Sequence, residues 1–422
     1  MTHSIASLRR IVNLEKQTLS SSLLTSPSRA AHLRQSNTRG LLQLLRAHNP
    51  CSKADLVRLS GLSAPTVSIG VAHLEQLGLV ESLGDGESSG GRPPAILRFN
   101  ATHAYVASAD IGGTRLRMML ADLNGVPVAQ WSTVLPKDQK TAEEICALVV
   151  DGMKIMCGES GVSTKKILHL TAGAPGVTDV DAGVVLAAPN LKNWNDVPLR
   201  NMLQKTTGLR VIVENDTNLA AIGEYHRGVA RGMNDFLFIG LGTGVGAGIF
   251  IAGKIYHGAH WRAGEVGYFG VTGSRRQAIL VRETGQLERE IGGAGIEAYW
   301  NELLVSSKSS AALELGKLRV SQIFDLARDG DSMAREVLNR VAEILADVIA
   351  ETALLLDPKA VILGGGVGCH EQLRQATQAQ LARHELSELQ VLTSSLGTQA
   401  QLFGGVSLSL FASEPDLLLE NN

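Results

Sequence analysis

Two short glycine-rich turns carry the side chains best suited to chemistry in this 422-residue chain. The first, residues 110–114 (DIGGT), combines a carboxylate, two glycines and a hydroxyl, and the second, residues 242–248 (GTGVGAG), lacks only the acid. Glycines let the backbone approach a phosphate, the amides donate hydrogen bonds to it, and an aspartate can hold a metal ion through water. With a third glycine cluster at residues 364–366, these turns predict a nucleotide-phosphate site. Its candidate residues are Asp110, Gly112, Gly113, Thr114, Gly242, Thr243, Gly244 and Gly365.

Each glycine cluster follows an apolar, strand-like run. The runs are residues 104–110 (AYVASAD), 236–242 (FLFIGLG) and 360–363 (AVIL), and a long amphipathic helix is expected at residues 331–356. One glycine turn after a strand is usually only a tight turn. Three such junctions spread over the chain favour a cleft, and strands that alternate with helices predict an α/β body.

Composition and cysteine usage exclude several classes of protein. The length allows two or three domains, and a formal net charge of −2 at pH 7 argues against binding nucleic acid over the whole surface. The four cysteines form no CxxC pair, which argues against a disulfide framework. No apolar segment reaches membrane-spanning length, and residues 1–31 lack a signal-peptide core. We therefore expect a cytoplasmic protein that makes no membrane contact, with a flexible tail over residues 1–31.

The region before residue 100 has the pattern of a small three-helix module. Clustered leucines predict a first helix over residues 38–47, and a capping box at Ser52 and Asp55 predicts a second that ends at the Gly61 turn. Ser63 is expected to cap a third helix. The expected inner face of the third helix is Val67, Val71, Leu74 and Leu77.

A glycine- and serine-rich hairpin is predicted after these helices, as in the wing of a winged helix-turn-helix. The start of the last helix of such modules enters the DNA major groove. The candidate contacts on this helix are Ala64, Pro65, Thr66, Ser68 and Ile69, small and apolar side chains that favour thymine methyl groups. Arg92, in Gly-Gly-Arg-Pro-Pro, is expected to enter a narrow minor groove. The alternatives are that Arg92 only tethers a linker and that the helices form a protein-interaction bundle.

Two longer motifs give the chain a family resemblance. Residues 214–224 (ENDTNLAAIGE) and residues 242–268 (GTGVGAGIFIAGKIYHGAHWRAGEVGY) resemble the ROK family of repressors, open reading frames and sugar kinases, and the similarity runs from about residue 36 to residue 410. The N-terminal module, with its GGRP stretch, is similar to that of the family's xylose and N-acetylglucosamine repressors. The resemblance implies an α/β protein with an N-terminal winged helix-turn-helix and a two-lobed actin- and hexokinase-like body.

The same resemblance implies where the domains begin and end. We expect the winged helix-turn-helix at residues 32–100, a first lobe at residues 101–216 and a second lobe at residues 217–399. A C-terminal helix at about residues 400–414 is expected to complete the first lobe.

A sugar site between the lobes is also implied. Asp216 takes the position of the family's general base, which accepts the proton of the reacting hydroxyl. The implied sugar contacts are Asn190, Asn215, Asp216, Glu265, Tyr268 and Glu288. Asn190 could instead cap a turn, and Glu288 could be an exposed helix residue. ATP and Mg²⁺ would be the cofactors if phosphotransfer is retained.

The family's structural zinc ligands, a histidine and three cysteines, are replaced in this sequence. Tyr268, Ile279, Val281 and Gln286 stand at their positions, and none is a usual zinc ligand. We therefore expect a metal-free loop without structural zinc, packed by Ile279 and Val281.

Three functions fit these features. A DNA-binding regulator with a sugar effector is favoured, because a DNA-binding module has no purpose in a metabolic kinase. It would bind operator DNA as a homodimer or homotetramer. The alternatives are an ATP-dependent sugar kinase and a protein that does both.

Overall fold

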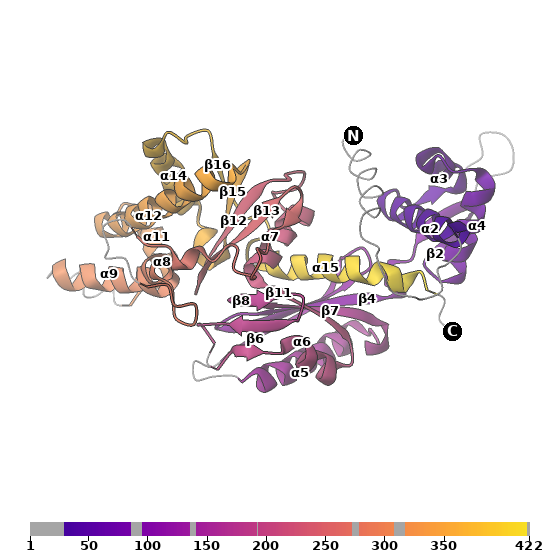
Figure 1. Ribbon diagram of the computed structural model, residues 1–422, viewed down its shortest axis with the longest axis horizontal. Coiled ribbons are helices and arrows are strands. Elements are labelled where there is room, and N and C mark those ends of the chain that lie inside the picture. The colour runs from indigo at the N-terminus through magenta and orange to yellow at the C-terminus, as the bar shows by residue number, and fades with distance from the viewer. Residues whose placement is uncertain are drawn as a thin grey trace. The chain divides into compact units, whose positions relative to one another are not determined.

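The computed structural model describes residues 29–85, 95–135, 141–191, 193–271, 278–307 and 317–419 (Figure 1). The chain divides into two compact units, Met1–Phe99 and Asn100–Asn422, and each is described by itself.

The described part of the first unit, residues 29–85 and 95–99, contains three helices and a small antiparallel sheet. The helices are α2 (Arg29–Ala47), α3 (Lys53–Ser60) and α4 (Ala64–Gln76). The strands are β1 (Cys51–Ser52), β2 (Val80–Asp85) and β3 (Ala95–Phe99), in the order β1-β3-β2. Leu41, Leu56 and Leu97 are fully buried and join helices and sheet in one core. This is the arrangement of a winged helix-turn-helix.

The predicted caps of this unit are confirmed. Ser52 and Asp55 form the capping box, with both N–H···O distances at 3.1 Å. The Ser63 hydroxyl accepts a hydrogen bond of 3.3 Å from Thr66 N at the start of α4. The first helix is longer than predicted, because it begins at Arg29, inside the segment assigned to the flexible tail. Leu77 lies beyond the last turn of α4 and is only half-buried.

The second unit contains two five-stranded sheets built on one plan. An antiparallel meander of three strands is followed by two strands parallel to the first, in the orders β11-β7-β4-β5-β6 and β14-β13-β12-β15-β16. The first sheet comprises β4 (Tyr105–Ile111), β5 (Arg115–Asp122), β6 (Pro127–Val134), β7 (Ile167–Ala174) and β11 (Arg210–Asn215). The second comprises β12 (Phe236–Leu241), β13 (Val245–Ile251), β14 (Lys254–Ile255), β15 (Ala360–Gly364) and β16 (Gln390–Thr393). The two principal glycine turns therefore occupy equivalent positions, each after the first strand of a sheet.

Helices cover both faces of each sheet. The outer face of the first sheet packs against α5 (Ala142–Ser160) and α6 (Leu199–Thr207). The outer face of the second packs against α8 (Gln286–Ile291), α9 (Gly293–Ser307), α11 (Val320–Asp329), α12 (Ser332–Leu356) and α14 (Glu371–Gln380). The predicted long helix is α12, which the Asp331 side chain caps.

Two helices, α7 (Asp216–Arg227) and α15 (Ala400–Leu417), lie between the sheets (Figure 1). They approach so closely that a β-carbon at Gly404 would lie 1.9 Å from the Leu219 carbonyl oxygen. A β-carbon at Gly223 would lie 2.2 Å from the Ala400 carbonyl oxygen. Larger residues at these two glycines would force the helices apart.

A third, three-stranded sheet extends the first lobe. It comprises β8 (Val177–Asp179), β9 (Val184–Ala187) and β10 (Asn195–Val197), in the order β10-β9-β8. Its β9–β10 connection carries Asn190. The cysteines Cys51, Cys146, Cys157 and Cys369 are all free thiols. None of the helices in the described ranges combines the length and apolar character of a membrane span.

Candidate functional site

The three predicted glycine turns meet in the second unit. A β-carbon at Gly113 would lie 3.6 Å from the Asn190 carbonyl oxygen and 3.7 Å from Thr243 Cγ2. A β-carbon at Gly242 would lie 3.8 Å from Gly366 N. Turns more than 110 residues apart in sequence thus line one space, and their lack of side chains would let a ligand come close to the backbone there.

The remaining candidates in these turns are either conformationally fixed or exposed. Gly365 has φ 80°, and a β-carbon there would lie 2.3 Å from the Leu241 carbonyl oxygen, so only glycine fits. Gly112 N donates to the Arg115 carbonyl at 2.9 Å and closes the β4–β5 turn. The side chains of Thr114 and Thr243 are exposed. These closely spaced glycine turns form a cradle that could accommodate a phosphate group.

Asp110 forms an ion pair with Arg117. It lies directly opposite Arg117 in the β4–β5 register, and its Oδ2 accepts from Arg117 Nε at 2.9 Å. Arg117 also donates to the Thr398 carbonyl. Burial raises the pKa of Asp110, and the guanidinium opposes that rise. A metal ion at Asp110 would have to compete with Arg117 for Oδ2, so this acid fits Mg²⁺ less well than the glycines fit phosphate.

Asp216 joins the end of β11 to the start of α7. Its Oδ1 accepts from Thr217 N at 2.7 Å and from Thr217 Oγ1 at 3.2 Å. Burial, and then the charge of Asp110, raises the pKa of Asp216 to about 7, although the Thr217 hydrogen bonds oppose the rise. A carboxyl group with this pKa can accept a proton near neutral pH, as a general base must.

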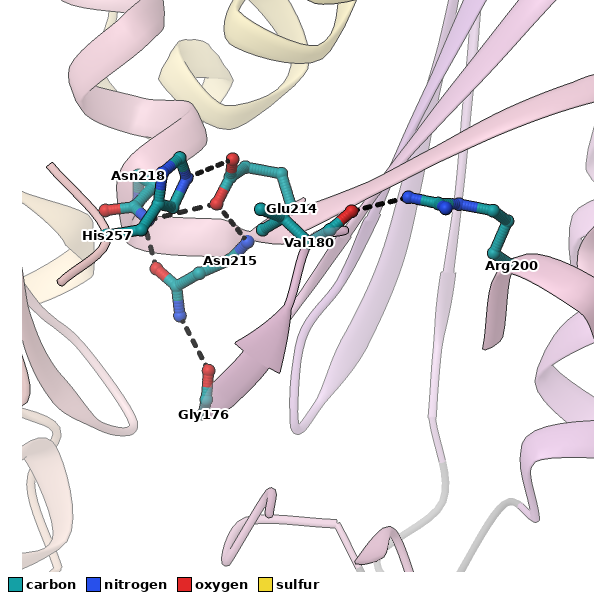
Figure 2. A network of polar contacts seen from close by, with 7 residues as sticks. All are labelled: Gly176, Val180, Arg200, Glu214, Asn215, Asn218 and His257. Carbon is teal, nitrogen blue, oxygen red and sulfur yellow. Dashed lines mark hydrogen bonds and ion pairs between the residues drawn. The ribbon is translucent and has the colours of Figure 1, made fainter. Parts of the chain in front are cut away.

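Asn215 is fixed by the elements around it (Figure 2). Its Oδ1 accepts from Asn218 N at 3.0 Å, and its Nδ2 donates to the Gly176 carbonyl at 2.9 Å. The adjacent Glu214 accepts from Asn218 Nδ2 at 3.0 Å and from His257 Nε2 at 2.8 Å. Because Glu214 belongs to the first sheet and His257 follows the second, this ion pair connects the two lobes.

Asp216, Glu265 and Glu288 are three acids that lie close enough for the charges of the other two to act on Glu265. Glu288, on α8, accepts from Val245 N at 2.9 Å and from Asn190 Nδ2 at 3.4 Å. Burial raises the pKa of Glu265 to about 7, helped by the charges of Asp216 and Glu288. Burial also raises the pKa of Glu288. The structure thus brings Asn190 and Glu288 together, and the pKa of Glu265 responds to both neighbouring acids. This group of carboxylates and amides could hold adjacent hydroxyl groups.

Tyr268 contacts the loop in which the family resemblance placed the replaced zinc ligands. Its hydroxyl donates to the Val281 carbonyl at 2.8 Å. Burial raises the pKa of Tyr268 to about 12, with contributions from Glu265 and Glu288. The predicted packing of Ile279 is wrong, since 65% of this residue is exposed. A backbone carbonyl rather than an apolar side chain gives Tyr268 its partner there.

No group of three or more histidine, cysteine, aspartate or glutamate residues has a metal-binding arrangement within the described ranges. Gln286, the fourth position of the replaced zinc site, is the first residue of α8.

The candidate DNA contacts lie on one side of α4. Ala64, Pro65 and Ser68 are exposed, and Ile69 is 65% exposed. Thr66 is half-buried, and its hydroxyl lies 2.8 Å from Ser63 Oγ. The opposite side of α4 is buried in the core, so the small and apolar side presented to solvent is available to a partner. Arg92 lies outside the described residues, and its role stays a prediction.

Sequence reasoning missed Arg117 and His257. A two-residue turn at Gly113 and Thr114 places Gly112 opposite Arg115 and therefore Asp110 opposite Arg117, so this pair could have been found. His257 is one of 11 histidines, and no spacing singles it out.

Comparison with known proteins identifies the family. Residues 106–411 match the sequence model of the ROK family. The chain belongs to the ROK family. The predicted family and its architecture, an N-terminal winged helix-turn-helix with a two-lobed body, are confirmed.

The relatives of this ROK protein include enzymes and repressors. A glucokinase of Halalkalibacterium halodurans is 31% identical over 310 residues, which cover 71% of this chain and 93% of that protein. A xylose repressor of Caldicellulosiruptor bescii is 26% identical over 385 residues, which cover 89% of this chain and 96% of that protein. The crystal structure of a ROK family transcriptional regulator, a homolog of the E. coli MLC protein, has the same fold. Its TM-score is 0.75 at 22% identity, over 92% of this chain and 98% of that one.

The extent of the alignments separates the two kinds of relative. The unit Asn100–Asn422 has 323 residues, and the xylose repressor matches about 375 residues of this chain. The match therefore includes at least about 50 residues of the N-terminal unit.

Proposed function

We propose that this ROK protein is a sugar-responsive, DNA-binding transcriptional regulator that represses genes for carbohydrate uptake or catabolism. One observation carries the proposal, which is that the similarity to a xylose repressor extends through the body into the N-terminal unit. A repressor acts on chromosomal DNA, so we expect this protein in the cytoplasm.

Operator DNA would bind at the N-terminal unit. The exposed side of α4, with Ile69 at its centre, would enter the major groove and contact thymine methyl groups. One small module reads few bases, so we expect a homodimer or homotetramer whose half-sites lie one or more helical turns apart, at about 34–36 Å per turn.

The sugar effector would bind between the lobes of the body. Asn190, Asn215, Glu265 and Glu288 would hold its hydroxyl groups, beside Asp216. Contacts such as Asn190 to Glu288 and His257 to Glu214 cross from one lobe to the other. A sugar that binds one arrangement of the lobes more tightly would therefore change the population of DNA-binding states. A sugar that binds both arrangements equally well would leave that population unchanged.

The test joins DNA binding to sugar binding. An operator is selected from random duplexes with the full-length protein, labelled with a fluorophore and titrated with D-xylose, D-glucose and N-acetyl-D-glucosamine. We expect one of these sugars to change the operator affinity of the wild type and of Asp216→Asn, because asparagine keeps a hydrogen-bonding group. The same sugar should not change the operator affinity of Glu265→Ala. The proposal fails if no sugar or sugar derivative changes operator affinity while the wild type phosphorylates a sugar at ordinary enzymatic rates.

A sugar kinase is the second candidate, because Asp216 has a pKa of about 7 beside a glycine cradle that fits phosphate. The glucokinase relative supports it. ATP would place its phosphates in the cradle, with Mg²⁺ near Asp110, and Asp216 would take the proton of the attacking hydroxyl. An ATP-dependent phosphorylation assay over the same sugars tests this directly. Activity in the wild type that disappears in Asp216→Asn, together with sugar-dependent operator release in both, would show a protein with both functions.

A further inference from the structure

One aromatic residue of the body has a backbone conformation that its side chain disfavours. The non-glycine residues with positive φ in the described ranges are Asn193, Asp196, Ala252, Trp261, Asp357 and Glu385. Asparagine and aspartate tolerate this region because their short polar side chains hydrogen-bond locally. Ala252 lies in the two-residue turn between β13 and β14, where such angles are required, and Glu385 ends a 3₁₀ turn. Trp261, at φ 61°, has no such local reason, and a bulky residue there is strained.

The loop that contains Trp261 is held in place by the second sheet. It runs from β14 to the 3₁₀ turn η3 (Val266–Tyr268). Gly258 and Gly264 in this loop also have positive φ, of 72° and 90°. Gly264 fits so closely that a β-carbon would lie 1.9 Å from the Ala247 carbonyl oxygen, and its own carbonyl accepts from Ala247 N at 2.7 Å. Tertiary contacts therefore impose the conformation of the loop. Position 261 is occupied by tryptophan, although glycine would adopt the same backbone angles without strain.

Trp261 packs against His257, whose hydrogen-bond partner Glu214 adjoins the candidate sugar contact Asn215. Its ring stands edge-on to His257, with the ring centroids 6.1 Å apart and the planes at 68°. His257 bonds to Glu214, next to Asn215 (Figure 2), and Glu265 follows Trp261 by four residues. Trp194 and Trp300 fill the cores, but Trp261 remains partly exposed. Core packing is therefore not the reason for an aromatic residue at this position.

We propose that Trp261 is an aromatic platform of the sugar site, on which the C–H face of a bound aldose ring packs, and that it contributes to the choice of sugar. This inference rests on the proposed sugar site and adds a contact to it. A flat aromatic surface beside carboxylates and amides matches a sugar, which has an apolar ring face and a polar rim. The strain at Trp261 is then the cost of presenting the ring in advance of binding.

The test uses the opposite effects that glycine should have on stability and on binding. In Trp261→Gly the strain is relieved, so the melting temperature of the full-length protein should stay the same or rise, while sugar affinity falls about tenfold. Trp261→Phe should keep most of the affinity, because it retains an aromatic face. Ala252→Gly is the matched control, since it relieves positive φ in an exposed turn and should leave sugar affinity unchanged. Affinity is measured by calorimetry with D-xylose, D-glucose and N-acetyl-D-glucosamine.

The possible outcomes separate this inference from the proposed function. Suppose that a sugar binds the wild type, that Glu265→Ala no longer binds it, and that Trp261→Gly binds it as tightly as the wild type does. Trp261 is then not a platform, whereas the proposed sugar site is retained. The inference is also overturned if Trp261→Phe binds as weakly as Trp261→Gly, because an aromatic face would then be insufficient. If none of the sugars binds the wild type, the proposed function and the platform fail together.

Discussion

Replacing Asp216 by asparagine is expected to stabilise the protein, and to do so more at about pH 8 than at about pH 5. Asparagine keeps an oxygen that can accept the two hydrogen bonds from Thr217, but it cannot ionise. The wild-type carboxyl group is largely desolvated beside Asp110, so its pKa rises from 3.8 to about 7 and it is ionised in the folded protein only above that pH. The substitution therefore removes a charge that the fold tolerates only at a cost.

The size and the sign of this effect follow from the two pKa values. A raised pKa means that the folded state binds the proton more tightly, so wild-type stability is greatest below the unfolded pKa and falls as the pH rises to about 7. A difference of about three pH units corresponds to about 4 kcal/mol at most. Asp216 is partly accessible and is coupled to Asp110 and Glu265, so we expect about half of that, about 2 kcal/mol, at pH 8.

Urea unfolding of both proteins across this pH range measures the difference. Asp151→Asn is the control, because the Asp151 side chain is 62% exposed on α5 and forms a long ion pair, 3.7 Å, with the exposed Lys154. It should change stability by less than about 0.5 kcal/mol at any pH. An Asp216→Asn protein that is less stable than the wild type at pH 8 would refute the burial argument. A gain that is the same at pH 5 and pH 8 would show that ionisation is not its cause.

Three further predictions concern the sugar site, the DNA-binding helix and the replaced zinc site. Glu265→Ala should weaken sugar binding by about 1–3 kcal/mol, because hydroxyl groups lose a buried partner, and unchanged affinity in calorimetry would contradict the site. Ile69→Ala should leave the melting temperature unchanged and weaken operator binding by about 1 kcal/mol, only where thymines face α4. An equal loss on thymine-free duplexes would contradict direct contact. Purified protein should contain no stoichiometric zinc, and chelators should not change its melting temperature, whereas one zinc per chain near Tyr268 would refute this.

Local signals in the sequence were sufficient for much of the secondary structure. The capping box at Ser52 and Asp55 and the cap at Ser63 depend on residues three positions apart, so the sequence alone could locate them. The apolar runs before each glycine turn became β4, β12 and β15. The start of α2 was missed because the polar residues from Arg29 onward lack the leucine spacing of the later turns.

Long-range contacts limited the prediction of the site. That the glycine turns would meet could be argued from their shared position after strands. The pair formed by Glu214 and His257, however, joins a residue of the first sheet to a loop residue 43 positions later, beyond the second sheet. The error at Ile279 has a similar origin, since the family resemblance indicates that a zinc ligand is replaced but not which way the new side chain faces. The roles of the candidate site residues remain predictions.

The position of α15 has a consequence for the order in which the chain folds during synthesis. Leu402 and Val406 on α15 cover Val106 and Met119 of the first sheet, so one face of that sheet stays uncovered until nearly the last described residue has left the ribosome. At ordinary translation rates the interval between Phe99 and Leu417 is roughly 15 to 60 s. The N-terminal unit has its own core and can fold at the start of this interval. In each nascent chain the winged helix-turn-helix can therefore fold well before the body that would control it is complete. A chain that ended before Ala400 would keep the DNA-binding unit but would lack α15, which completes the body.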